Sequence, residues 1–274
     1  MNGTASIIFA AGRGTRMTGY GGNKTLLPLI PGKSPYEGKR PLIMEVLENL
    51  PPGPKAIVVN YLEEEVRRVT GGHEISYVRQ PVTNGTGGAL LAARSFLDST
   101  DADRVIITMG DVPFIRSATY GRLLERLGRY DLALLAFECE DKRTYGLIET
   151  DGERVIKVIE WKYWKDFSAR RQGRLRFCNA GVYAVRKQAL LTYMERMAAK
   201  PHEVRKLVNG EWVAINEYFI TDIAEMMNAD GLQVGMTSAP EQETIGVDSP
   251  ESLKAAQEQY AGLTEKEAKS ARRA

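Results

Sequence analysis

Hydrophobic residues in the first half of the chain occur in short runs, separated by segments whose apolar positions have helical spacing. Five of these runs predict β-strands, namely Ser6–Phe9, Ile57–Asn60, Ile75–Arg79, Val105–Met109 and Asp131–Glu138. The segments Leu62–Thr70 and Gly88–Leu97 predict helices between them. This alternation indicates an α/β fold in which a doubly wound, mostly parallel sheet carries helices on both faces.

The pattern changes after about residue 145, where short strands and turns follow one another. Strands are predicted at Gly146–Glu149, Val155–Glu160 and Phe177–Val185, with a turn at Asp151-Gly152. We therefore expect a single domain over residues 1–262, with a first part of about residues 1–140 and a smaller β-rich lobe of about 141–245. The charged residues 263–274 predict a solvated helix end or a tail.

A glycine-rich loop with three cations follows the first predicted strand. Gly12 and Gly14 allow backbone N–H groups to approach an anion, while Arg13, Arg16 and Lys24 offer donors suited to phosphate oxygens. No Gly-Lys-Ser/Thr sequence ends the loop, and the third glycine of the dinucleotide fingerprint is missing. The loop predicts a triphosphate site of another kind, and an ordinary glycine-rich turn with surface cations is the alternative.

A second glycine-rich loop follows the strand that ends near Arg79. Its glycines at Gly85, Gly87 and Gly88 allow close approach of a ligand, and Thr86 can cap the next helix or donate to a ligand. Gln80 presents a donor and an acceptor on one flat amide, which suits the edge of a pyrimidine base. An ordinary capped turn is the alternative.

Two carboxylates follow predicted strands and are candidate metal ligands. Asp111 stands in Gly-Asp-Val-Pro after the strand Val105–Met109, and Asp248 stands in Gly-Val-Asp-Ser-Pro. Mg²⁺ prefers one or two carboxylates together with phosphate oxygens and water. The alternatives are an Asx turn before proline at Asp111 and a helix N-cap at Asp248.

Composition limits the classes of partner. Thirty-seven basic and 35 acidic residues leave a net charge of +2, which does not indicate nucleic-acid binding. No apolar run is long enough to cross a membrane, and no leader segment is recognisable. Cys139 and Cys178 lack a metal-binding spacing, so reduced cysteines and a cytoplasmic location are expected.

The combined motifs resemble the sugar-1-phosphate nucleotidyltransferases, and in particular the uridylyltransferase domain of the bifunctional N-acetylglucosamine-1-phosphate enzymes. The resemblance covers about residues 5–260. It is carried by Ala-Ala-Gly-Arg-Gly-Thr-Arg-Met (10–17), Lys24, Gln80, Gly85-Thr-Gly-Gly-Ala, Gly110-Asp-Val-Pro, Tyr145-Gly-Leu-Ile, Glu160, Asn179-Ala-Gly-Val, Glu217-Tyr-Phe-Ile-Thr-Asp-Ile and Gly246-Val-Asp. It implies a Rossmann-like fold of the nucleotide-diphospho-sugar transferase type, with Mg²⁺ as cofactor and an NTP and a sugar 1-phosphate as substrates.

The resemblance also implies roles for residues at matching positions. Arg16 and Lys24 would act as catalytic residues on the phosphates, and Asp111 and Asp248 would bind the metal. The implied nucleotide-binding residues are Ala10, Ala11, Gly12, Arg13, Gly14, Thr15, Gln80, Gly85 and Thr86. The implied sugar-binding residues are Gly146, Glu160, Asn179 and Thr221, which places the sugar in the β-rich lobe.

Several departures from these relatives leave the sugar open. Asp248 stands where the bifunctional enzymes carry asparagine, Asn23 replaces the usual proline before the lysine, and residues 32–41 form an extra stretch. The hexapeptide-repeat region for acetyl transfer has no counterpart, so acetyl transfer is not expected. UTP with N-acetylglucosamine 1-phosphate is the favoured pair. The alternatives are another NTP and sugar phosphate, a silent sugar-nucleotide sensor and a metal-dependent glycosyltransferase.

Overall fold

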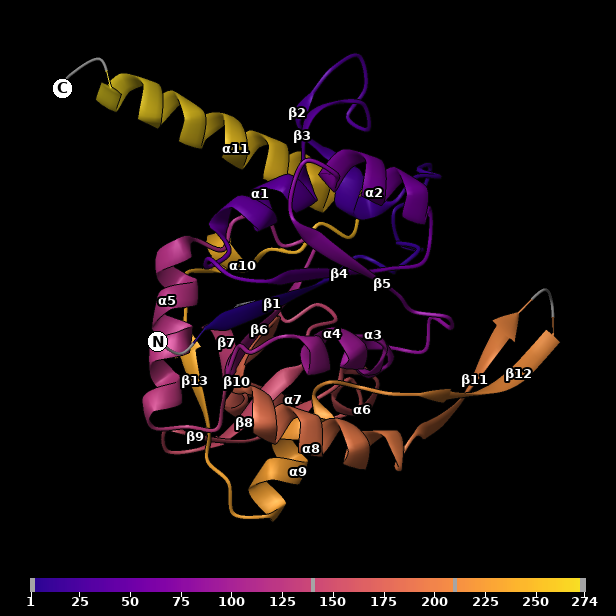
Figure 1. Ribbon diagram of the computed structural model, residues 1–274, viewed down its shortest axis with the longest axis vertical. Helices are drawn as coiled ribbons and strands as arrows, with labels where there is room; N and C mark the ends of the chain where they lie inside the picture. The colour runs from indigo at the N-terminus through magenta and orange to yellow at the C-terminus, as the bar shows by residue number, and fades with distance from the viewer. Residues whose placement is uncertain (1–2, 139–140, 209–210, 272–274) are drawn as a thin grey trace.

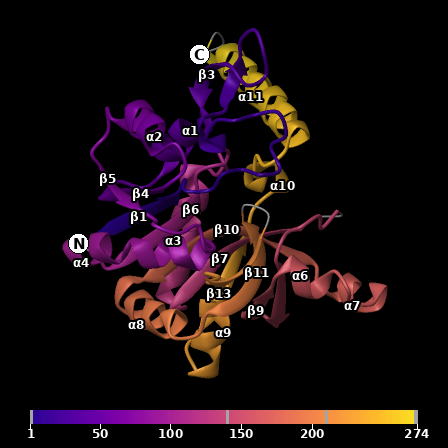
Figure 2. The ribbon, with the colours of Figure 1, turned by 90° about the vertical axis from the view of Figure 1, so that its right-hand side faces the viewer.

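The computed structural model describes residues 3–138, 141–208 and 211–271, and a central β-sheet with helices on both faces dominates it (Figures 1 and 2). Along the sheet the strand order is β13-β7-β10-β6-β1-β4-β5, with β8 and β9 joined to it through β10. The strands of this sheet are β1 (Thr4–Phe9), β4 (Lys55–Val59), β5 (Ile75–Arg79), β6 (Arg104–Met109), β7 (Leu132–Glu138), β8 (Leu147–Asp151), β9 (Arg154–Ile159), β10 (Phe177–Arg186) and β13 (Val234–Ser238).

Most of the helices fall between strands, as the alternating pattern predicts, and α10 and α11 follow the last strand. The α-helices are α1 (Leu42–Asn49), α2 (Glu63–Thr70), α3 (Thr86–Ala92), α4 (Arg94–Ser99), α5 (Ser117–Glu125), α6 (Trp161–Trp164), α7 (Ala169–Arg174), α8 (Lys187–Ala198), α9 (Asp222–Ala229), α10 (Glu241–Thr244) and α11 (Pro250–Ala271). Two 3₁₀ helices, η1 (Lys24–Leu26) and η2 (Arg126–Gly128), complete the set in the described residues. The segment Gly88–Leu97, predicted as one helix, is divided between α3 and α4 at Ala93.

The centre of the sheet is buried on both faces, which explains its nearly continuous apolar strands. In β1, Ile7 packs in the core on one face, and its neighbour Ile8 packs in the core on the other. β1 pairs in parallel with β4 and β6, and Phe9 lies opposite both Val58 and Met109. The loops after β1, β4 and β6 therefore leave the same edge of the sheet.

The mostly parallel sheet that the sequence predicts is confirmed, with two differences in detail. β10 runs antiparallel to both β6 and β7, and a register shift interrupts its pairing with β7 between Asn179 and Tyr183. The β-rich segment is a hairpin of β8 and β9 that extends the main sheet from the beginning of β10, where Phe177 pairs with Ile148. The first part and the β-rich lobe thus share one sheet.

In the part of the chain that the structure describes, two antiparallel hairpins lie outside this sheet, and the sequence pattern did not reveal either. The stretch 32–41 belongs to the hairpin of β2 (Pro28–Pro31) and β3 (Gly38–Pro41), which lies beside α11 (Figure 1). The other hairpin joins β11 (His202–Val208) to β12 (Glu211–Glu217) and projects from the body (Figure 1). α11 continues through Ala271, so the charged residues from 263 to that point are the end of a helix.

The membrane and cysteine expectations have different outcomes. Among the described residues, no helix is both long and apolar enough to cross a membrane. Cys178 is buried in β10 and is disulfide-bonded, so the expectation that the cysteines are reduced is not confirmed. Cys139 lies outside the described residues.

Candidate active site

A cavity of about 250 Å³ lies at the edge of the sheet where β1 and β6 end, and it brings together most of the candidate residues from the sequence. Those that line it are Arg16, Lys24, Thr86, Asp111, Gly146, Glu160, Asn179, Thr221 and Asp248. They come from loops far apart in the sequence. In open α/β sheets, ligands bind beyond the carboxyl ends of the strands, and this cavity has that position.

The first glycine-rich loop holds Lys24 by close packing. Gly14 has a φ of +62°, and a Cβ at this position would lie 3.2 Å from Cβ and 3.3 Å from Cδ of Lys24. A larger residue would therefore be strained and would displace the lysine stem. The other loop residues, Ala10 to Thr15, do not line the cavity itself. They remain nucleotide-binding candidates by their place in the loop.

Each of the two cations pairs with one of the two candidate metal carboxylates. Lys24 Nζ donates to Asp111 Oδ2, and this pair is largely buried. Arg16 Nη2 lies 2.8 Å from Asp248 Oδ2, and Arg16 Nη1 donates to Thr144 Oγ1 at 2.8 Å. The contact that the structure describes for the Asp111 carboxylate is with Lys24. An Asx turn would instead need this carboxylate to accept from a nearby backbone N–H, so the Asx-turn alternative is not supported.

The segments that carry Asp111 and Asp248 are tied together by their backbones. Val247 N donates to Asp111 O at 2.9 Å, so the residue before Asp248 is fixed beside Asp111. Among the described residues, no group of three or more His, Cys, Asp or Glu side chains is arranged to hold a metal. Two carboxylates are the protein's usual share of a Mg²⁺ site when substrate phosphates complete the coordination. The donor set therefore fits Mg²⁺ that binds together with a nucleotide.

The N-terminus of α11 is capped by serines, so the alternative of Asp248 as N-cap is wrong. Ser252 N donates to Ser249 Oγ at 3.2 Å, and Ser252 Oγ accepts from the N–H groups of Ser249 and Asp248. Pro250 occupies the first helical position, which it favours. The Asp248 carboxylate is thus available to Arg16 and the cavity.

The second glycine-rich loop is fastened to the segment that precedes α9. Gly87 N donates to Tyr218 O at 2.9 Å, and Thr86 Oγ1 accepts from Ile220 N at 3.2 Å. Gly85, with a φ of +95°, is the N-cap of α3, so Thr86 begins this helix and does not cap it. Gln80 is 3% exposed, and its Nε2 donates to Asn84 Oδ1 and Gly85 O at 3.2 Å each. Gln80 and Gly85 do not line the 250 Å³ cavity.

Further polar groups that line the cavity are held in place by hydrogen bonds. Thr221 Oγ1 donates to Glu160 Oε1 at 2.7 Å, and burial raises the pKa of the Glu160 carboxyl. Asn179 Nδ2 donates to Tyr183 Oη at 2.7 Å, and Asn179 Oδ1 accepts from Gly181 N at 3.1 Å. The register shift in β10 falls at these residues and turns them toward the cavity edge.

Thr144 and Tyr145 also line the cavity and were not among the candidates from the sequence. Tyr145 is held by Trp164, whose Nε1 donates to Tyr145 O at 2.8 Å. Burial raises the pKa of the Tyr145 phenol, and the Asp248 charge raises it further. The position of Tyr145 directly before Gly146 in a recognised motif was the available signal.

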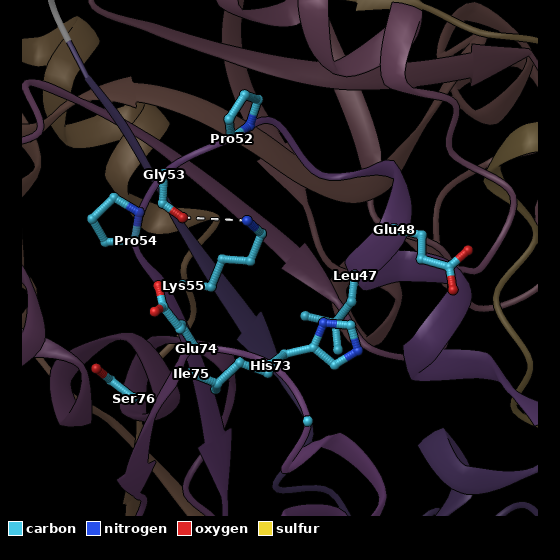
Figure 3. A pocket seen from close by; sticks show the side chains of 11 residues that line it. Leu47, Glu48, Pro52, Gly53, Pro54, Lys55, His73, Glu74, Ile75 and Ser76 are labelled. Carbon is cyan, nitrogen blue, oxygen red and sulfur yellow. Dashed lines mark hydrogen bonds between the residues drawn. The ribbon is translucent and has the colours of Figure 1, made fainter.

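A larger cavity, of about 1020 Å³, lies at the other edge of the sheet (Figure 3). It is lined by the residues around the beginnings of β4 and β5, among them Pro54, Lys55 and His73. Lys55 Nζ donates to Gly53 O at 3.2 Å within it. None of the candidate site residues lines this cavity, so its size does not make it the active site.

Comparison with known proteins agrees with the geometry. The family model of the MobA-like NTP transferase domain matches residues 6–238 of this chain. Proteins named bifunctional protein GlmU from Ruegeria sp. and Sphingopyxis alaskensis are 32% and 31% identical over 93% and 98% of this chain. The chain spans about half the length of these curated relatives, at 52% and 55%.

A solved structure shares the fold. It is a putative glucose-1-phosphate thymidylyltransferase from Bacillus anthracis, determined in complex with a sucrose, with a TM-score of 0.66 and 19% identity. The alignment covers 94% of this chain and 95% of the other. The resemblance found in the motifs and the predicted fold class are thereby confirmed. The chain belongs to the family of MobA-like NTP transferase domains.

Proposed function

We propose that the protein transfers a uridylyl group from UTP to a sugar 1-phosphate, with Mg²⁺ as cofactor, and releases pyrophosphate. The observation that carries this proposal is the cavity of about 250 Å³ that Arg16, Lys24, Asp111 and Asp248 line together with Glu160 and Asn179. The first four residues offer charges for phosphates and a metal, and the last two offer hydrogen-bonding groups for hydroxyls.

The chemistry requires the protein to bring two anions together and to stabilise the charge that develops between them. A sugar 1-phosphate is already an anionic nucleophile at neutral pH, so no base is needed to activate it. Arg16 and Lys24 would neutralise the triphosphate and orient the α-phosphorus toward the sugar phosphate. Asp111 and Asp248 would hold Mg²⁺, which supplies further charge stabilisation at the phosphates when it is bound.

The orientation of Gln80 suits the imino edge of uracil. Because both hydrogen bonds from its Nε2 go to protein acceptors, the group left for a base is the acceptor Oε1. Uracil offers its N3–H donor to such an acceptor. The equivalent ring nitrogens of cytosine and adenine carry no hydrogen, and these bases would have to donate from their exocyclic amino groups. Guanine and thymine also have an imino N–H, so GTP and dTTP are the competing nucleotides.

For the sugar we propose N-acetylglucosamine 1-phosphate, with Gly146, Glu160, Asn179 and Thr221 around it. Support comes from the curated relatives, named as GlmU, and from the motifs shared with the N-acetylglucosamine-1-phosphate uridylyltransferases. The Glu160 carboxylate and the Asn179 amide are suited to sugar hydroxyls. Because UTP and sugar 1-phosphates are metabolites of the cytoplasm, we place the reaction there.

A screen of pyrophosphate release tests the proposal. UTP, dTTP, GTP, CTP and ATP are each combined with several sugar 1-phosphates, with and without Mg²⁺. We expect release only when sugar phosphate and Mg²⁺ are both present, with kcat/KM highest for UTP and N-acetylglucosamine 1-phosphate. Preference for dTTP or GTP would reassign the nucleotide. Hydrolysis without a sugar phosphate, or no turnover with any pair, would exclude the transfer reaction.

A further inference from the structure

Asn23 is an uncharged side chain that is completely buried beside the candidate catalytic lysine. It is 0% exposed, and its amide makes four hydrogen bonds. Nδ2 donates to Ala10 O at 3.0 Å and to Tyr61 O at 2.8 Å. Oδ1 accepts from Thr25 N at 3.0 Å and from Thr25 Oγ1 at 2.8 Å. Both donors and both acceptor sites of the amide are therefore used.

The partners of Asn23 belong to the segments that surround Lys24. Ala10 follows β1, Tyr61 follows β4, and Thr25 lies in η1, whose first residue is Lys24. Asn23 is the N-cap of η1 and so fixes the backbone direction at Lys24. The Tyr61 hydroxyl also donates to Gly21 O at 2.7 Å, which holds the chain just before Asn23.

We propose that Asn23 is the positioning residue of Lys24. This role rests on the proposed function, in which Lys24 binds the triphosphate. The side chain of Lys24 leaves this capped turn, packs over Gly14 and reaches Asp111. Its stem is flexible, so the position of Nζ depends on the backbone from which it starts. The Asn23 amide links that backbone to the ends of β1 and β4.

The backbone of Asn23 explains how asparagine serves where related enzymes carry proline. Its φ of −77° and ψ of 123° lie within the range that a proline ring allows. Proline restricts φ to this range through its ring, whereas Asn23 holds its backbone in place through four hydrogen bonds. Asn23→Pro should therefore lose the bonds yet keep the direction of Lys24, and Asn23→Ala should lose both.

Three variants, Asn23→Ala, Asn23→Asp and Asn23→Pro, separate positioning from a merely structural role. Asn23→Asp keeps an oxygen that can cap η1 but places a carboxylate against the carbonyl oxygens of Ala10 and Tyr61. We expect Asn23→Ala and Asn23→Asp to lower kcat by roughly 10- to 100-fold, because small misplacements of a catalytic group have effects of this size. The KM for the sugar phosphate should change by less than about threefold. Asn23→Pro should lose thermal stability and still retain kcat within about threefold of the wild type.

Asn228→Ala is the matched control. The Asn228 amide also donates to backbone carbonyls, at 2.6 Å to Val155 O and 2.9 Å to Ile156 O, but it lies on α9 and does not line the cavity. This variant should lose stability without a fall in kcat. If Asn23→Ala behaves in the same way, or if Asn23→Pro is as inactive as Asn23→Ala, the positioning role is wrong.

A second measurement keeps the test independent of the proposed reaction. The rate at which acetic anhydride modifies Lys24, followed by peptide mass spectrometry, reports how firmly its amine is held at Asp111. We expect Asn23→Ala to increase this rate several-fold and Asn23→Pro to leave it near the wild-type value. An unchanged rate in Asn23→Ala overturns the inference. A wild type without turnover would overturn only the proposed function, and the labelling would still decide the role of Asn23.

Discussion

Lys24 and Asp111 form a direct ion pair between the loops that follow β1 and β6. The side chain of Asp111 is 12% exposed and that of Lys24 is 21% exposed, so each charge compensates a partner that has little water around it. Arg16 and Asp248 form a second, more exposed pair across the same cavity. Both candidate metal carboxylates therefore face a cation that the proposed mechanism assigns to the phosphates.

Replacement of Lys24 by methionine should have opposite effects on metal binding and on catalysis. A metal ion that binds Asp111 must compete with the ammonium group of Lys24, so Lys24→Met should bind Mn²⁺ more tightly in the absence of nucleotide. Transfer should fall by roughly 100- to 1000-fold, because a charge-stabilising contact with the phosphates is lost. Titration of free Mn²⁺ by electron paramagnetic resonance measures the first effect, and steady-state kinetics measures the second.

Lys157→Met is the control for this experiment. Lys157 is a partly exposed lysine that lies 3.9 Å from both Glu149 and Glu225, away from the metal carboxylates. Its loss should change neither Mn²⁺ affinity nor kcat by more than about twofold. Equal Mn²⁺ affinities for Lys24→Met and the wild type would show that Lys24 does not compete for Asp111.

Asp248 and Ser249 should have separate functions although they are neighbours. Asp248→Ala should lower activity strongly with little loss of stability, because the serines cap α11. Ser249→Ala should cost about 1 kcal/mol of unfolding free energy, as expected for a lost N-cap, and should leave most of the activity. Urea unfolding without metal, combined with Mg²⁺ titrations of turnover, distinguishes them. A larger stability loss in Asp248→Ala than in Ser249→Ala would assign the cap to Asp248.

This pair of residues shows what the sequence reveals and what it does not. Asp111 and Asp248 could be selected because parallel strands end at one edge and bring their loops together. The sequence alone did not decide whether Asp248 or Ser249 caps the helix, since both residue types cap well. Tertiary contacts decide which residue is the cap. Val247 is hydrogen-bonded to Asp111, and the Asp248 carboxylate pairs with Arg16 and not with the helix N-terminus.

Other features of the fold and the site depend on tertiary contacts, which short-range sequence patterns do not contain. The direction of β10 is one example, because an apolar run such as Phe177–Val185 fits parallel and antiparallel pairing equally well. Asn23 is another, since an asparagine in a glycine-rich loop suggests a turn and not a buried amide. Its four hydrogen bonds go to Ala10, Thr25 and Tyr61, and Tyr61 is 38 positions away from Asn23 in the sequence.

The hairpin that contains residues 32–41 should support the first glycine-rich loop. The ring of Tyr36 stacks on that of Tyr20, with centroids 5.5 Å apart, and Tyr36 Oη donates to Thr18 O at 3.3 Å. Gln257 on α11 donates to Pro35 O at 2.8 Å and holds the hairpin from the other side. Tyr36→Ala should raise the KM for UTP about 3- to 10-fold with kcat nearly unchanged, because the loop loses its stacking contact.

Steady-state kinetics of Tyr36→Ala, Tyr36→Phe and Trp212→Ala provides the measurement and its controls. Tyr36→Phe keeps the stack and should remain within about twofold of the wild type. Trp212, which is 64% exposed on β12, is an aromatic residue away from this loop and should have no effect when replaced. A fall in kcat with an unchanged KM for UTP would mean that the hairpin acts on the transfer step.

The buried carboxyl of Glu160 should make the stability of the protein depend on pH. Burial raises its pKa above the ordinary value, and the hydrogen bond from Thr221 opposes this shift only in part. A raised native pKa means that the folded state binds the proton more tightly than the unfolded state. Its stabilising contribution is therefore fully present below the unfolded pKa and is lost as the pH rises through the native pKa.

Glu160→Gln removes the charge but keeps the shape and the partner of Thr221. The difference in unfolding free energy between this variant and the wild type should shift in favour of the variant as the pH rises from about 4 toward neutrality. At neutral pH the variant should also have a higher KM for the sugar phosphate, because a charged acceptor for hydroxyl groups becomes a neutral amide. Urea unfolding at several pH values and sugar-phosphate kinetics measure the two effects. A pH-independent difference would show that Glu160 titrates alike in the folded and unfolded states, and that its burial does not control its charge.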